Sequence, residues 1–247
     1  MADVRNIIVG AAQIFVSTGT GAARPDTTSA SLFPTASVST KTTLLSSSNW
    51  RDVGYTNAGL EVSYEPGYND VMVDQLLDAA RLFKSTIKVL LKTELTEGTL
   101  QNINLVMGQA EIQSAYSGST SSTYNTVTGS YSGSSGSSGS ATLNLAAGAL
   151  GDAPVERSLV AVGNAPGVIT TSASTSAAGT AVATGAKTER VYVARRVVQV
   201  EASTHGLKRD SATVFPVQFR CLPDDDNKYD GAEYGIIIDR VLGSSWT

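Results

Sequence analysis

The side chains that could carry out a reaction are few in this chain. His205 is its only histidine, and it lies in a short Ser203-Thr204-His205-Gly206 run between two strand-like segments. A general base needs a partner acid and a pocket that brings the substrate to it. The sequence near His205 supplies neither, so we interpret this histidine as a structural residue.

The acidic run Asp224-Asp225-Asp226 is the best candidate for a metal site. A calcium loop of the EF-hand type needs acidic oxygens at alternate positions, a central glycine and a terminal glutamate. Asp230 and Glu233 lie close by, but their spacing does not match that pattern. Charge runs are usually solvated, so we predict an exposed turn and no metal ligands here.

Two further patterns of enzymes are incomplete. Gly19-Thr20-Gly21 lacks the lysine of a phosphate-binding loop. Serine is abundant, yet no serine lies in a nucleophile elbow, and no histidine–acid pair accompanies one. We therefore predict that the chain is not an enzyme, with no catalytic residue, no cofactor-binding residue and no cofactor.

Composition favours a β-rich assembly or surface protein. Hydrophobic residues make up 41% of the 247 residues, whereas charged residues make up only 16%, below the usual ~25%. The net charge is −4, and the one dense cationic cluster, Arg195-Arg196, lies inside a valine-rich segment. A stable nucleic-acid binder shows clustered Lys and Arg. A mildly acidic protein instead repels phosphate backbones, which would let DNA pass without sticking.

Processing signals and cross-links are not expected. Cys221 is the only cysteine, so an intramolecular disulfide is excluded, and we predict that it is a small buried apolar residue. The first residues are too polar for a signal peptide, and no segment is long and apolar enough to span a bilayer. These patterns predict a soluble protein made in a cytoplasm.

The sequence pattern predicts that strands make up most of the secondary structure that would position any site. Apolar blocks with β-forming residues alternate with long uncharged tracts, and no charge occurs between Glu111 and Asp152. One helix is expected, with its cap at Thr96 or Gly98, Glu97 in its first turn and its end at Gly108. The segment 76–84 is ambiguous, because its apolar residues have helical spacing but the segment is short. The expected strands are 6–18, two strands within 53–75 around a turn at Pro66-Gly67, 85–95, one or more within 141–164, and then 190–201, 212–222 and 234–242.

The uncharged tracts predict three long loops within a single domain, 1–247. Residues 19–49 form a loop or extended arm, too long for a simple surface turn and expected to pack on a neighbouring subunit. Residues 113–140 form an exposed Ser/Gly-rich insertion, with at most a weak hairpin. Residues 166–186 form a second low-complexity loop.

Several segments resemble the major tail tube proteins of bacteriophages, in the form found in siphophages. The similar segments are 49–59 (NWRDVGYTNAG), 71–75 (VMVDQ), 95–103 (LTEGTLQNI), 215–224 (FPVQFRCLPD) and 234–237 (YGII). They occur in the family's order and extend over about two-thirds of the chain. Each motif alone is weak, and together they are fairly specific.

The resemblance implies a mainly β fold: a β-sandwich or barrel with one flanking helix and long loops. It implies a structural virion protein of the viral tail, in which hexameric rings stack into a tail tube and inner strands join into a ring-wide β-barrel. Genome DNA would pass through this conduit during ejection into the host without stable binding. The implied partners are further copies of the chain and the tape measure, tail terminator and tail tip proteins, with no membrane.

Alternation suggests which residues face the lumen of such a tube. In 60–65 and 85–95, apolar residues alternate with polar ones, which puts one face in a core and the other in water. An outer face or a contact between rings fits this alternation equally well. The lumen-facing candidates are Glu61, Glu65, Asp70, Asp74, Lys88, Lys92 and Glu94.

Two other functions compete with the tail tube. A β-rich virion decoration or adhesin-type module would use the Ser/Gly/Thr-rich loops as its binding surface. A hydrolase would use one of the serines, but the missing histidine–acid pair argues against it. Within the tail tube hypothesis, the long insertions favour a non-contractile tail, because no sheath must then fit around the tube.

Overall fold

The computed structural model is mainly β, as predicted, with one helix among the described residues. The predicted arm 19–49 lies outside the described residues, as do most of 113–140 and 166–186. The structure describes residues 8, 10, 12–18, 50–72, 74, 81–108, 113–115, 123–125, 130–132, 140–143, 145, 150–151, 153–166, 168–169, 180–181, 187–201, 203–207, 209–226 and 230–242.

An eight-stranded antiparallel sheet forms the body, in the order β2-β1-β9-β12-β13-β4-β3, with β14 also paired to β12. The sheet is open, because β2 and β3 at its two ends do not pair with each other. Its strands are β1 (Gln13–Ser17), β2 (Trp50–Asp52), β3 (Thr56–Val71), β4 (Arg81–Leu95), β9 (Arg157–Asn164), β12 (Lys187–Gln199), β13 (Phe215–Cys221) and β14 (Gly235–Leu242).

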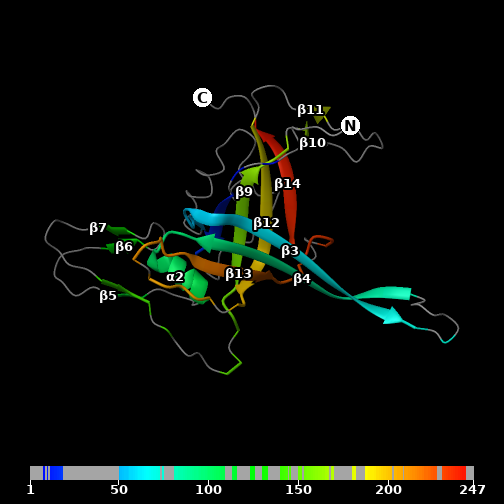
Figure 1. Cartoon of the computed structure of the whole chain (residues 1–247), viewed down its shortest axis with the longest axis horizontal. Helices are drawn as coiled ribbons and strands as arrows, with labels where there is room; N and C mark the ends of the chain where they lie inside the picture. The colour runs from blue at the N-terminus through cyan, green and yellow to red at the C-terminus, as the bar shows by residue number, and fades with distance from the viewer. Residues whose placement is uncertain are drawn as a thin grey trace.

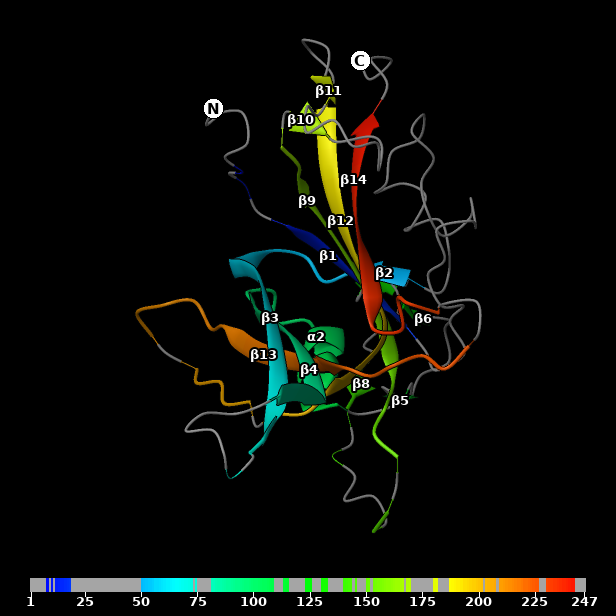
Figure 2. The ribbon, with the colours of Figure 1, turned by 90° about the vertical axis from the view of Figure 1, so that its right-hand side faces the viewer.

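The sheet forks along β12. The first part of β12 pairs with β14, from Lys187 opposite Leu242 to Ala194 opposite Gly235. From Val197 onward, the same edge of β12 pairs with β13 instead. We call β2, β1, β9, β14 and the first part of β12 the long half-sheet, and β13, β4, β3 and the end of β12 the hairpin half-sheet. The two half-sheets run in clearly different directions (Figures 1 and 2).

The core lies on both faces of the long half-sheet. Successive residues of β9, Leu159, Val160 and Ala161, are all buried, although their side chains point to alternate faces. One cluster contains Ile14, Leu159 and side chains of β4, β13 and the helix. The other contains Phe15, Trp50, Val160, Val191 and Val193.

The single helix among the described residues, α2 (Leu100–Met107), confirms the predicted helix and its end at Gly108. The predicted cap was wrong: the side chain of Thr99 accepts the hydrogen bond from the Asn102 N–H, and Glu97 lies before the helix. Thr96 cannot cap the helix because its backbone N–H and its hydroxyl both donate to the carbonyl of Tyr55. Leu105 and Val106 anchor the helix in the core.

The predicted turn at Pro66-Gly67 was also wrong. Strand β3 runs straight through both residues, with Pro66 opposite Ile87 and a register shift just after Gly67. A proline removes one backbone donor, which an edge strand tolerates because one side of its backbone has no partner strand. The proline therefore marks an edge strand and not the end of a hairpin.

Most other predicted strands are confirmed. Those predicted at 190–201, 212–222 and 234–242 correspond to β12, β13 and β14, and the one predicted at 85–95 begins earlier, at Arg81. Of the predicted strand 6–18, residues Gln13–Ser17 form β1, whereas residues 8, 10 and 12 are not in a strand and the rest before β1 lie outside the described residues. The short strands in the low-complexity tracts pair as β5 (Gln113–Ala115) with β8 (Ser140–Thr142), β6 (Thr123–Asn125) with β7 (Ser130–Ser132), and β10 (Val168–Ile169) with β11 (Thr180–Ala181). Within the described residues, no helix has the length and apolar character needed to span a bilayer.

Candidate functional site

The β3–β4 hairpin brings four of the predicted site residues together. Glu61 lies opposite Lys92, and Glu65 lies opposite Lys88, so all four point to one face of the hairpin half-sheet. They line a hollow of about 440 Å³ that also receives Glu201 and Arg220. Glutamates and cations therefore alternate over this surface, which we call the polar face.

The polar face is balanced in charge. It carries three carboxylates, from Glu61, Glu65 and Glu201, and three cations, from Lys88, Lys92 and Arg220. Such a surface attracts neither anions nor cations over long distances, because the fields of interspersed opposite charges cancel beyond the spacing of the charges and salt screens the remainder.

The remaining predicted residues lie outside the hollow, although Glu94 shares the face of Lys92 on β4. Glu94 is opposite Pro216 on β13, and its carboxylate accepts a hydrogen bond from the Asn57 amide at 2.8 Å. Asp70 is opposite Leu82 near the end of the hairpin, and alternation along β3 puts it on the face opposite to Glu61. Asp74 lies just beyond β3 and is exposed.

The apolar side of β3 is not the core face that alternation predicted. Val62 is 42% exposed and Tyr64 is 56% exposed, although Leu91 opposite Val62 is buried. Val62 faces β12 and β14 across the fork, whereas the outer part of the hairpin extends away from the other strands, as Figure 1 shows, and among the described residues no second layer covers it. Alternation therefore predicted which side chains share a face, but not how far each of them is buried.

The outer part of the hairpin is a two-stranded ribbon with exposed apolar side chains on it. Leu82 is 61% exposed and Phe83 is 49% exposed, and Tyr68, Val71 and Met72 on β3 or just after it are exposed as well. Lys84 donates a hydrogen bond to the hydroxyl of Tyr64 at 2.9 Å, and this bond raises the pKa of the lysine. Isolated two-stranded ribbons are marginally stable in water, so this ribbon is suited to packing against another surface.

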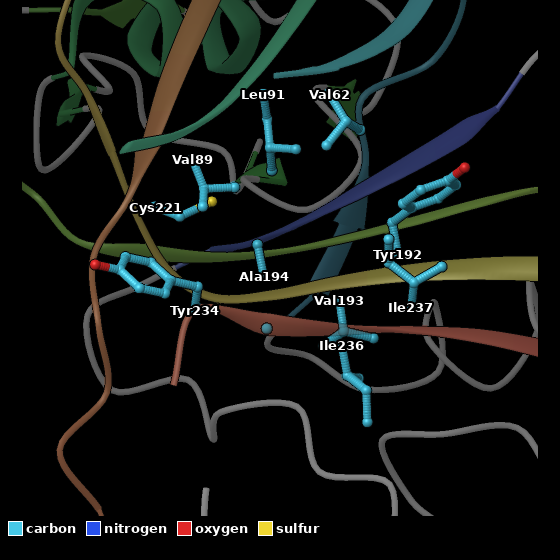
Figure 3. Close-up of a pocket in the computed structure, with 11 residues that line it drawn as sticks. Val62, Val89, Leu91, Tyr192, Val193, Ala194, Cys221, Tyr234, Ile236 and Ile237 are labelled. Carbon is cyan, nitrogen blue, oxygen red and sulfur yellow. The ribbon is translucent and has the colours of Figure 1, made fainter. Parts of the chain in front are cut away.

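An apolar cavity of about 170 Å³ lies in the fork between the half-sheets. Figure 3 shows Val62, Val89 and Leu91 of the hairpin on one side, and Tyr192, Ala194 and Ile237 of β12 and β14 on the other. Cys221 borders the cavity and is buried, as predicted. Burial raises the pKa of its thiol to about 12.

A buried polar network fixes the base of the hairpin. The guanidinium of Arg51 donates to the side-chain oxygen of Asn102 at 2.6 Å and to the carbonyl of Gln101 at 3.0 Å. The Asn102 amide donates in turn to the carbonyls of Val53 and Glu97, each at 2.9 Å. Our site prediction omitted Arg51 and Asn102. The sequence did hold one indication that Arg51 is buried, because it lies between the apolar residues Trp50 and Val53.

The structure also describes the surroundings of His205 and of the acidic run 224–226, which the sequence offered as candidates for chemistry. The His205 ring lies 4.8 Å from the Phe215 ring and is partly buried. Asp224 is buried, not solvated as predicted, while Asp225 and Asp226 are exposed. The carboxylate of Asp224 accepts from the Asp226 N–H at 3.4 Å, and its own N–H donates to the carbonyl of Glu233. No group of three or more His, Cys, Asp and Glu side chains in the described part is arranged to hold a metal ion.

Comparison of the chain with protein-family models and with curated protein sequences found no match.

Proposed function

We propose that this chain is a structural subunit that polymerises with copies of itself into stacked hexameric rings, forming the tail tube of a bacteriophage. The observation that carries this proposal is the β3–β4 hairpin, which leaves the body of the molecule with apolar side chains exposed along it. The motif resemblance of segments 49–59 and 95–103 to tail tube proteins supports the same function.

Apolar side chains are exposed on both faces of the hairpin. The register puts Val62, Tyr64, Tyr68 and Leu82 on one face, and Val71 and Phe83 on the other. Together with Met72, which follows β3, these side chains expose on the order of 600 Å², which is at the upper limit for a monomer. A partner that packs around the ribbon could therefore bury an area close to the ~800 Å² per partner of a stable interface.

The open sheet supports self-assembly as well. Among the strands that the structure describes, β2 and β3 end the sheet, so each leaves one row of backbone N–H and C=O groups without a partner strand. Such edges pair readily with other chains. In the proposed tube, a neighbouring subunit covers β3 and completes the sandwich or barrel that a single chain leaves open. Head-to-tail contacts form a closed ring when the rotation between neighbours closes, whereas a contact between stacked rings does not close and repeats along the tube axis.

The polar face is the proposed lumen surface. Glu61, Glu65, Lys88 and Lys92 would face the channel, with Glu94 at its margin. Equal numbers of carboxylates and cations give DNA no strong site to bind, which supports passage without retention. The tape measure, tail terminator and tail tip proteins are the further partners proposed, and no catalysis is assigned to the chain.

Negative-stain electron microscopy of the purified protein at rising concentration tests this function. Hollow tubes of stacked rings are the expected result. Particles that stay monomeric under all conditions, even with virion tail tips added as nuclei, would overturn it. That outcome would favour a virion decoration or adhesin-type module, whose binding to host surfaces would then be measured.

A further inference from the structure

Two adjacent arginines of β12 lie at the fork. Between Ala194 and Val197, the pairing of β12 with β9 shifts in register. On the other edge, the partner of β12 changes from β14 to β13 over the same interval. Arg195 and Arg196 therefore lie at the point where the long half-sheet ends and the hairpin half-sheet begins.

These arginines hold both ends of the connection between β13 and β14. Arg195 is buried and donates to the carbonyl of Ala232, just before β14. Arg196 donates to the carbonyl of Pro223, just after β13, at 2.8 Å. The backbone adds to this attachment, because the Leu222 N–H donates to the Arg196 carbonyl at 2.8 Å.

Glu156 completes the arrangement from the side of β9. Its two carboxylate oxygens accept from Nε and Nη2 of Arg196, at 2.9 and 2.6 Å. A two-bond contact between a guanidinium and a carboxylate fixes direction as well as distance. One side chain thus links the residue before β9, the bulge in β12 and the end of β13.

We infer that Glu156 and Arg196 are positioning residues that set the angle between the half-sheets and so aim the β3–β4 hairpin. The inference rests on the proposed function in one respect: in the proposed tube, the orientation of the hairpin presents it to the next copy of the chain. The pair is partly exposed, so it contributes little to global stability. Its role is to select one of several fork openings that the core alone would allow.

The chain contains a matched control on the same strand. Arg190 of β12 also makes a two-bond contact, with Asp239 of β14, at 2.6 and 2.7 Å. That pair is similarly exposed but lies within the long half-sheet, six positions before Arg196. Asp239→Asn therefore removes a comparable ion pair without touching the fork.

Distance measurements between two spin labels test the inference without requiring assembly. Labels at Asn69→Cys, on the hairpin, and Asn164→Cys, at the end of β9, are both on exposed residues, and the buried Cys221 stays in place. Wild type and Asp239→Asn are expected to give one narrow distance distribution. Glu156→Gln and Arg196→Lys, which both lose the two-bond contact, are expected to shift or broaden it with an unchanged melting temperature.

Two outcomes would overturn the inference. One is a spin-label distance distribution in Glu156→Gln that equals that of wild type. The other is a distance distribution that broadens equally in Asp239→Asn and Glu156→Gln. Tube formation is scored separately by electron microscopy. A narrow wild-type distribution that broadens only in the fork variants supports the inference even where wild type forms no tubes, in which case the proposed function alone fails.

Discussion

The side-chain amide of Asn102 donates a hydrogen bond to the backbone carbonyl of Val53 at 2.9 Å. These residues are 49 positions apart and belong to two of the segments on which the proposed resemblance to tail tube proteins rests, 49–59 and 95–103. The first motif supplies β2 and the approach to β3, and the second supplies the start of α2. Their contact therefore joins the helix to the base of the hairpin.

Asn102→Ala is expected to lower the free energy of unfolding by about 2–4 kcal/mol, because it leaves the buried Arg51, the buried Val53 carbonyl and the partly buried Glu97 carbonyl without this partner. Urea unfolding followed by circular dichroism measures the change. Asn57→Ala is the control, since Asn57 is exposed and makes one surface hydrogen bond, to Glu94. Equal costs for the two variants would contradict the role assigned to Asn102.

Gly54 and Gly59 both have positive φ, at 82° and 69°, but their surroundings differ. A Cβ at Gly54 would meet the Glu97 carboxyl carbon at 2.1 Å, whereas a Cβ at Gly59 would meet nothing within 4 Å. Gly59→Ala is expected to cost about 1–2 kcal/mol of stability from backbone strain alone. Gly54→Ala should cost about 1 kcal/mol more, because Glu97 must release the Tyr55 N–H. Chemical denaturation of both variants checks the difference, and a smaller loss at Gly54 would refute it.

Stability is expected to fall in alkaline solution through Cys221. Its folded pKa is raised to about 12 from an ordinary value of 9.0. Between these values the unfolded chain loses the proton and the folded chain keeps it, so rising pH favours unfolding. Wild type should lose about 1.4 kcal/mol more than Cys221→Ala between pH 8 and pH 10. Urea midpoints at the two pH values provide the test, and parallel losses in both proteins would contradict the prediction.

Phe83→Ser should leave the monomer as stable as wild type to within about 0.5 kcal/mol, because the ring is half exposed. The concentration needed for tube formation should rise about tenfold or more, as expected when an anchor of an interface is removed. Leu207→Ser is the control, since Leu207 is 90% exposed and lies away from the hairpin. Light scattering at increasing concentration measures both. Similar thresholds for the two variants would count against the hairpin as the assembly contact.

The sequence predicted elements whose signals are local. Alternation in 85–95 and the valines of β12 identified strands, and Gly108 marked the end of α2, because period and cap chemistry act over a few residues. The turn at Pro66-Gly67 failed because the same two residues also suit an edge strand. Whether β3 is an edge strand depends on the order of the whole sheet.

The candidate site was predicted only in part, because some of its residues follow from local alternation and others from the order of the whole sheet. Alternation placed Glu61, Glu65, Lys88 and Lys92 correctly on one face, since each pair lies in a single hairpin. The contributions of Glu201 and Arg220 depend on β13 lying beside β4, which no local pattern encodes. The exposure of Tyr64 could not be predicted either, because alternation indicates which side chains share a face and not whether anything covers them.

The fork in β12 has a mechanical consequence. Strand β4 runs from Leu90, beside the contact of β13 with β12, to Arg81 at the outer end, so the hairpin is a lever of about 30 Å at ~3.4 Å per residue. A rotation of about 8° at its base would displace the tip by roughly 4 Å, about one strand spacing. A small change in the positions of two side chains at the fork would therefore move the tip of the hairpin by about the distance between neighbouring strands. The regularity of a long polymer would then depend on the stiffness of a joint only a few residues long.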